Sequence, residues 1–367
     1  MDKELVELFC KLVSIPSPSG KEREVLNYVK SRLSKLGIAS HFDDAGSKVG
    51  SDSGNLIAKL GSGKPSLLFM AHVDTVEDGK RRIKPVIKGN VIRSDGETIL
   101  GSDDKAGVAA LLGAIKAIRS LDKLPSITCA FSVREEAGIM GANYLGVTEN
   151  VDYAFDVDGS NPPGLFINKA LGNLAFELEI KGKESHAAAD PEGGRNAIKA
   201  AAIMVAQLKL GRGASGSTLN IGKISGGKAN NIIPGKAVLT GELRAYKKTD
   251  MEKDFKALEK AAQHACMITG CTYKLRRESY DAPLNVPEKG RIVSLSKAAA
   301  ASAGLRFTLK TIRGTIQASA LAARGYDVLG LSKGGKHAHS TDECIGVKEL
   351  ADTRNLIVEL VKQSKKF

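Results

Sequence analysis

The sequence predicts an α/β protein in which a mostly parallel sheet has helices on both faces and a smaller α+β domain is inserted into it. Two amphipathic helices are expected within residues 1–36, and from residue 54 onward apolar runs alternate with helical patterns. Such alternation is typical of parallel sheets whose strands are joined by helices. Between residues 172 and 282 the order becomes strand, helix, strand, strand, helix, strand, which is the ferredoxin-like arrangement. From residue 283 helix and strand alternate again.

These changes of pattern set the predicted domain boundaries. Residues 1–171 and 284–367 form one domain, and residues 172–283 form the insertion. In the first domain, buried strands are expected at 66–74, 126–134 and 151–158. In the insertion, strands are expected at 174–181, 218–224, 237–246 and 272–277, with helices at 196–210 and 251–269. The 367 residues and a hydrophobic content of 42% suffice for two cores.

Polar side chains follow several expected strands of the first domain, or precede the next helix. These residues are His72, Asp74, Asp103, Glu135, Glu136 and Asp158. A single acid at a strand end is usually a solvated cap, but recurrence at successive strand ends of one parallel sheet favours a binding site. A carboxylate shared by two divalent cations about 3.5–4 Å apart is the usual build of a two-metal hydrolytic centre. Zinc suits such a mixture of imidazole and carboxylate ligands.

Seven motifs, in this order, make the chain similar to the co-catalytic metallopeptidase family of zinc aminoacylases, peptidase T and carboxypeptidase G-type enzymes. The motifs are His72-Val-Asp74-Thr, Gly101-Ser-Asp-Asp-Lys-Ala-Gly107, Arg134-Glu-Glu-Ala-Gly138, Asp158-Gly, Ser185-His-Ala, Gly226-Gly-Lys-Ala-Asn-Asn-Ile-Ile-Pro234 with Glu242-Leu-Arg244, and His339-Ser-Thr-Asp-Glu343. The resemblance covers nearly the whole chain. It implies that residues 1–171 and 284–367 form a metal-binding catalytic domain and that the insertion is a lid and dimerisation domain.

The resemblance also implies the metal ligands. Asp103 corresponds to a carboxylate that bridges two divalent ions, with zinc expected and cobalt or manganese as alternatives. His72 and Asp158 would complete one site, and Glu136 and His339 the other. His337 is an alternative to His339, because the two imidazoles stand on the same side of an extended segment. His339 is preferred because the family's pattern continues after it.

Three further residues take catalytic roles by resemblance. Asp74 would accept the other ring N–H of His72 and so fix its tautomer. Glu135 would be the general base that takes a proton from water and hands it to the leaving amine. His186 corresponds to a histidine that reaches the site from a partner subunit and donates to the developing oxyanion. Taken alone, His186 fits an ordinary loop residue.

Residues of the insertion match positions where the family holds the substrate. Asn231 and Arg244 are the substrate-binding candidates, with Lys228 and Asn230 as weaker ones. An arginine can clamp a carboxylate with two hydrogen bonds. Arg244 equally fits the solvent face of a strand.

The predicted function is that of a dizinc exopeptidase that hydrolyses short peptides at one end, similar to peptidase T-like aminopeptidases. Asp158, in place of a glutamate, favours the peptidase branches. Two departures bear on specificity: Gln317 stands where an acid is common, and the segment Lys333-Gly-Gly-Lys-His-Ala lacks an asparagine. The alternatives are a deacylase of N-acyl amino acids, a carboxypeptidase of the same family and, from another class, a non-catalytic peptide-binding protein.

Composition and charge narrow the classes of binding partner that the sequence predicts. The net charge of +13 is dispersed and aromatic residues are only 5%, so no nucleic-acid partner is predicted. No apolar run reaches about 18 residues and no secretion signal is recognised, so we expect a cytoplasmic protein without a membrane partner. The five scattered cysteines are expected to be reduced. A homodimer through the insertion is predicted from the resemblance.

Overall fold

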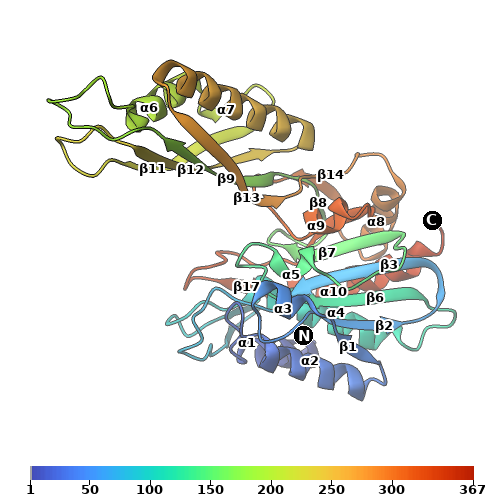
Figure 1. The fold of residues 1–367 in the computed structure, drawn as a ribbon. Coiled ribbons are helices and arrows are strands. Elements are labelled where there is room, and N and C mark those ends of the chain that lie inside the picture. The colour runs from blue at the N-terminus through green and yellow to red at the C-terminus, as the bar shows by residue number, and fades with distance from the viewer. Residues whose placement is uncertain (1) are drawn as a thin grey trace. The chain divides into compact units, whose positions relative to one another are not determined.

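The computed structural model describes residues 2–367, which fold into two compact units (Figure 1). Unit 1 consists of Met1–Lys169, Val286–Ile312 and Ile316–Phe367, and unit 2 of Ala170–Asn285 with Arg313–Thr315. Each unit has a hydrophobic core of its own. The chain therefore leaves the first unit, builds the second and returns.

The larger sheet has nine strands in the spatial order β1-β2-β6-β3-β7-β16-β8-β14, with β15 beside β8. They are β1 (Ser40–Phe42), β2 (Leu56–Leu60), β3 (Gly63–His72), β6 (Pro125–Ser132), β7 (Tyr153–Gly159), β8 (Leu165–Ala170), β14 (Leu284–Asn285), β15 (Thr308–Thr311) and β16 (Val328–Ser332). The central strands β6, β3, β7 and β16 run parallel, whereas β1, β2 and the pair of β16 with β8 are antiparallel. Strands β6, β7 and β16 are almost wholly buried because both faces of the sheet are covered.

The helices of the first unit contact the sheet as two groups. The helices are α1 (Lys3–Val13), α2 (Arg23–Lys35), α3 (Ala45–Val49), α4 (Ser102–Ile118), α5 (Met140–Asn143), α8 (Arg291–Ser302), α9 (Ala318–Ala323) and α10 (Val347–Ser364). Helix α4 lies against β3 and β7 and packs against α1 and α10, while α3, α5 and α9 form the other group. A small sheet of β17 (Cys344–Gly346), β5 (Val91–Arg93) and β4 (Val86–Lys88) completes the unit.

Unit 2 has the predicted ferredoxin-like order. Its elements are β9 (Gly172–Lys181), α6 (Ala197–Gln207), β10 (Gly211–Arg212), β11 (Thr218–Gly226), β12 (Lys236–Ala245), α7 (Lys248–Thr269) and β13 (Thr272–Asp281). The sheet order is β10-β11-β12-β9-β13, and every pair is antiparallel. Alternate residues of β9 are buried, which gives the sheet one face for α6 and α7.

The predicted fold class is confirmed, with one refinement. Antiparallel strands at its edges make the larger sheet mixed. None of the helices in residues 2–367 combines the length and apolar character that a membrane-spanning segment needs. The five cysteines are free thiols.

Candidate active site

The candidate site lies where the parallel strands of unit 1 end. His72 is the last residue of β3, and Asp158 lies near the end of β7. Glu135 and Glu136 follow β6, while Asp103 belongs to the first turn of α4. Because the carboxyl ends of parallel strands meet at one edge of a sheet, residues far apart in the sequence come together there.

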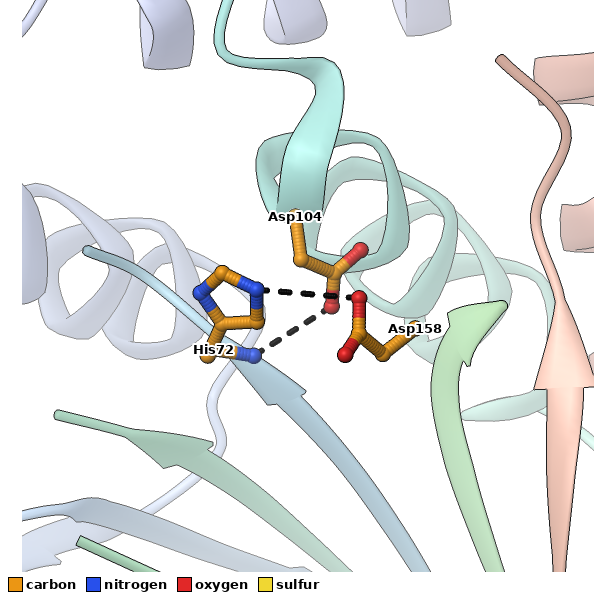
Figure 2. A group of neighbouring side chains, drawn as sticks. All are labelled: His72, Asp104 and Asp158. Atoms are coloured by element: carbon orange, nitrogen blue, oxygen red, sulfur yellow. Dashed lines mark hydrogen bonds and ion pairs between the residues drawn. The ribbon is translucent and has the colours of Figure 1, made fainter. Parts of the chain in front are cut away.

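The first group of candidate ligands is built around His72. Its Nε2 lies 3.7 Å from Asp103 Oδ1 and 3.6 Å from Asp158 Oδ1. Figure 2 shows the ring of His72 beside the Asp158 carboxylate, with Asp104 close to the backbone of His72. His72 is 1% exposed. Burial opposes protonation of its ring, but Asp158 and Asp103 outweigh that effect and raise the pKa of His72 well above its usual range. The carboxylates of Asp103 and Asp158 therefore strongly favour a positive charge beside them.

The second group uses the other oxygen of Asp103. Asp103 Oδ2 lies 3.5 Å from His339 Nε2, which is 2.9 Å from Glu136 Oε1. One possible ligand atom from each of Asp103, Glu136 and His339 lies within 4.8 Å of the other two. Two imidazoles and two carboxylates around one shared carboxylate are a donor set that fits two divalent cations of the zinc type.

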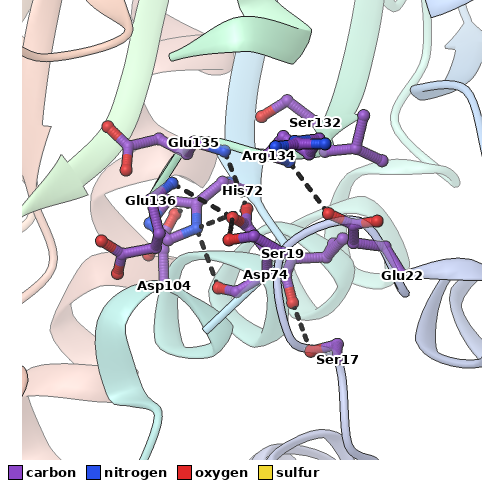
Figure 3. Close-up of polar contacts among 12 residues, drawn as sticks. Ser17, Ser19, Glu22, His72, Asp74, Asp104, Ser132, Arg134, Glu135 and Glu136 are labelled. Atoms are coloured by element: carbon purple, nitrogen blue, oxygen red, sulfur yellow. Dashed lines mark hydrogen bonds and ion pairs between the residues drawn. The ribbon is translucent and has the colours of Figure 1, made fainter. Parts of the chain in front are cut away.

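Asp74 positions both glutamates and the first histidine (Figure 3). Its carboxylate accepts hydrogen bonds from the backbone N–H of Glu135 at 3.0 Å and of Glu136 at 3.1 Å, and from Ser19 Oγ at 2.6 Å. Nδ1 of His72 is 3.4 Å from Asp74 Oδ1 but only 3.1 Å from the Asp74 carbonyl oxygen. The backbone of Asp74 is thus the nearer acceptor for the ring.

Glu22 adds a second support for the turn that carries the two glutamates. It is fully buried and accepts hydrogen bonds from the N–H of Arg134, from Gly20 N and from Ser51 Oγ. Arg134 has a φ of 52°, a left-handed conformation that a side chain rarely adopts without outside support. The tight turn brings the side chains of Glu135 and Glu136 to the same side (Figure 3), where one carboxylate oxygen of each lies within 4.8 Å of the other and of a ring nitrogen of His72.

Glu343 holds the segment that presents Asp103. Its buried carboxylate accepts from the N–H groups of Leu100, Gly101 and Asp103 at 2.7–3.0 Å and from Ser102 Oγ at 2.6 Å. The sequence contained Glu343 in the last family motif but gave it no role. Its position four residues after His339, within one motif, was the available signal.

Burial also changes how the two glutamates bind protons. It raises the pKa of Glu135 to about 9 and that of Glu136 to about 7. Without cations the Glu135 carboxyl therefore holds a proton at neutral pH. Cations beside these groups would favour their ionised forms.

Two buried acids, Asp104 and Asp156, were not anticipated from the sequence. Asp104 accepts hydrogen bonds from the backbone N–H of His72 and Gly107. Asp156 accepts from Ala318 N at 2.9 Å and from Gln317 Nε2 at 3.3 Å. An acid in place of Gln317 would face the Asp156 carboxylate, so the departure at Gln317 satisfies a buried acid and leaves the metal groups unchanged.

The positions of His337 and His339 show which of the two lies with the other predicted ligands. His339 Nε2 faces Asp103 and Glu136, as described above, and half of its side chain is exposed. His337 instead lines a separate hollow with Asp342 and Glu349. His339 is therefore the histidine that lies with the other predicted ligands.

His186 and Asn231 lie on neighbouring segments of unit 2. An isolated bridge pairs His186 with Ile232, and Ala187 N donates to the Asn231 carbonyl at 2.9 Å. Nδ1 of His186 accepts from the N–H groups of Ala188 and Ala189. Since Nδ1 is an acceptor, the neutral ring carries its proton on Nε2 and presents a donor there. The imidazole is exposed.

Arg244 lies on β12 and lines a hollow of unit 2 together with Arg212 and Arg313. Its guanidinium makes two hydrogen bonds to Glu242, at 2.9 and 3.1 Å. Glu242 therefore orients Arg244 and neutralises part of the charge of the three arginines.

Comparison with known proteins agrees with the fold. The peptidase dimerisation domain family matches residues 168–268, and the M42 glutamyl aminopeptidase family matches residues 86–163. Protein YqjE of Bacillus subtilis is 31% identical over 100% of this chain and 99% of its own. Aminopeptidase PepT from Bacillus cereus has a crystal structure with a TM-score of 0.90 and 30% identity, covering 99% of this chain and 98% of that one. The chain belongs to the co-catalytic metallopeptidase family that contains peptidase T.

A second solved member of the family supports the same assignment. A tripeptidase from Staphylococcus aureus has a TM-score of 0.88 and 27% identity, and covers 100% of this chain and 99% of that one. The predicted family and enzyme class are thereby confirmed. The protein is a metallopeptidase that hydrolyses peptide bonds.

Proposed function

We propose that this metallopeptidase is a dizinc exopeptidase that removes an end residue from short peptides. The observation that carries the proposal is the position of the Asp103 carboxylate. One of its oxygens faces His72 on the side of Asp158, and the other faces His339 on the side of Glu136. A carboxylate with a different histidine at each oxygen is suited to bridging two cations.

The proposed ligands are His72, Asp103 and Asp158 for one cation, and Asp103, Glu136 and His339 for the other. When bound, two cations would lower the pKa of a water molecule and polarise the carbonyl group of the substrate. Asp74 orients His72 and the backbone of both glutamates, so its contribution is to position the ligands.

Glu135 is the proposed general base. Asp74 holds its backbone N–H, and a carboxylate oxygen of Glu135 lies within 4.8 Å of ligand atoms of His72 and Glu136, beside the two proposed ligand sets. It would accept a proton from the attacking water. After the carbon–nitrogen bond breaks, it would deliver that proton to the nitrogen of the leaving amine.

The partner subunit's His186 is the proposed donor to the oxyanion. Its Nε2–H is available because Nδ1 is already engaged by two backbone N–H groups. The match of residues 168–268 to a peptidase dimerisation domain supports a homodimer through unit 2. A donor that meets the oxygen mainly when it becomes negative lowers the barrier of the reaction.

The arginine-lined hollow is the proposed site for the carboxylate of the peptide. Arg212, Arg244 and Arg313 supply three guanidinium groups there, and Glu242 orients one of them. Asn231 lies beside the segment of His186 and would bind the substrate backbone. Aminopeptidase and tripeptidase activity in two related proteins supports cleavage at the amino end of short peptides. A cytoplasmic location remains a prediction.

The experiment is a substrate screen with metal analysis on the same sample. Protein loaded with zinc is assayed against dipeptides, tripeptides with free and blocked ends, and N-acyl amino acids. We expect hydrolysis of short peptides with a free amino end, and loss of activity on chelation. Cleavage of N-acyl amino acids alone would replace the proposal with a deacylase, and loss of activity only when the carboxyl end is blocked would favour a carboxypeptidase.

A further inference from the structure

A lysine side chain lies inside the candidate metal site. Lys333 directly follows β16 and is 1% exposed. Its Nζ lies 3.0 Å from Asp103 Oδ1, 3.1 Å from the Asp158 carbonyl oxygen and 3.4 Å from Asp158 Oδ1. It is also 3.8 Å from Asp104 Oδ1. The ammonium group thus contacts both carboxylates of the first ligand set.

The backbone holds this lysine in place. Lys333 N donates to the Gly159 carbonyl at 2.8 Å, and Thr353 Oγ1 donates to the Lys333 carbonyl at 3.1 Å. The residue is therefore anchored on both sides, with its side chain enclosed among acids.

Lys333 contacts the Asp103 oxygen that faces the first ligand set, not the oxygen that faces the second. Asp103 Oδ1 and Asp158 Oδ1, the oxygens it contacts, are the same two that face His72 Nε2. The ion pairs of Lys333 within residues 2–367 are with Asp103, Asp104 and Asp158, and Glu136 is not among them. The other ligand set uses Asp103 Oδ2. A positive charge fixed beside one set repels a cation there more strongly than at the other.

We propose that Lys333 makes the two cation sites unequal. Its ammonium group competes for Asp103 Oδ1 and Asp158 Oδ1, so the site of His72 and Asp158 is the weaker one and the site of Glu136 and His339 fills first. The inference rests on the ligand sets of the proposed function. Binding of the second ion then requires a higher metal concentration than binding of the first.

The test is calorimetric titration of metal-free protein with zinc, comparing the natural chain with Lys333→Met. Methionine fills similar space without the charge. We expect two classes of site in the natural chain, and in the variant a gain of at least about tenfold in the affinity of the weaker class, with the tighter class unchanged. Lys105→Met is the matched control, since Lys105 is also buried but its Nζ donates to the Ile15 carbonyl. A weaker class that is unchanged or weakened in Lys333→Met would overturn the proposal.

A second measurement does not depend on a variant that folds. Crystals of the natural chain with one equivalent of zinc should show an anomalous peak between Glu136 and His339. A peak beside His72 and Asp158 would overturn the proposal. Both readouts concern metal binding, so they are separate from the peptide assay. Unequal sites in a protein that cleaves no peptide would contradict the proposed function alone, and equal sites in an active peptidase would contradict this inference alone.

Discussion

The two units of the chain treat charged side chains differently. Unit 1 buries a set of charged and titratable groups: Glu22, His72, Asp74, Asp104, Lys105, Asp156, Lys333 and Glu343. In unit 2, among the residues that the structure describes, Ser217 is the buried polar side chain and none that is buried is charged. There the acids form ion pairs at the surface, such as that of Glu252 with Arg277.

This difference reflects two requirements: stability favours charged groups at the surface, whereas a site for catalysis and metal binding brings charged groups together in the interior. Burying an ionised group is costly unless partners compensate it, so a domain selected only for stability keeps its acids outside. Unit 2 does so. Unit 1 gathers acids at one sheet edge and raises the pKa of several of them, which is typical of functional sites. Substitutions at the buried acids should therefore affect catalysis and metal binding, whereas those in unit 2 should affect catalysis only where a residue reaches the substrate.

The largest effect is expected from Glu135→Ala. Removal of the general base should lower kcat by roughly 100- to 10,000-fold, while the protein keeps its metal because Glu135 is outside both ligand sets. Steady-state kinetics and elemental analysis of the same preparation check this. Glu136→Ala is the control and should lose metal. If Glu135→Ala loses metal and Glu136→Ala does not, their roles are exchanged.

His186→Ala should have the next largest effect, and it is the prediction that links the two units. Loss of an oxyanion donor should lower kcat by about 100- to 1,000-fold, with a smaller change in KM, because the contact forms mainly in the transition state. Mixed Glu135→Ala and His186→Ala chains should recover partial activity, since one site of each heterodimer has both an intact base and an intact donor. Subunit exchange without recovery would mean that His186 does not act across a dimer.

Glu343→Gln should destabilise unit 1 moderately. The carboxylate accepts from three backbone N–H groups and from Ser102 Oγ, and an amide replaces part of that acceptor with a donor. We expect a loss of about 1.5–3 kcal/mol in the free energy of unfolding, together with weaker metal binding through Asp103. Glu349→Gln is the matched control because Glu349 accepts from Gly346 N, near the start of α10. Its metal affinity should stay normal, and equal metal loss in both variants would contradict the account.

A further prediction concerns the effect of pH on the stability of metal-free protein. Burial raises the pKa of Glu135 to about 9, of Asp156 to about 8 and of Glu136 to about 7. Between pH 5 and 7 the folded metal-free protein therefore holds protons that the unfolded chain has released, and its stability should fall as pH rises. The direction follows from linkage, because the folded state binds more protons than the unfolded state in this range. Denaturant unfolding at several pH values measures this slope. Stability that rises over the same range in metal-free protein would contradict it.

Much of unit 1 could be predicted because its signals are local. The apolar run of β3 ends at His72, and polar residues also follow β6 and close β7, so strand ends alone indicated where the site would lie. The alternation along β9 and the order of elements predicted the ferredoxin-like unit in the same way. The individual roles of Glu135 and His186 came only from family resemblance.

Lys333 and Glu343 could not be assigned, because their roles depend on distant partners. Lys333 follows an apolar strand in a glycine-rich stretch, a pattern equally typical of a surface lysine. Its contact with Asp103 joins residues 230 positions apart. Glu343 likewise meets a segment about 240 residues earlier in the chain. Sequence periodicity does not indicate contacts between residues so far apart in the chain, and only the folded sheet brings them together.

Anomalous diffraction from crystals saturated with zinc tests the central claim, that Asp103 bridges two metal ions. Two peaks about 3.5–4 Å apart are expected, one on each side of the Asp103 carboxylate. The peak beside His72 and Asp158 should be the last to appear as zinc is raised. A single peak at saturation, or two peaks without Asp103 between them, would contradict the account.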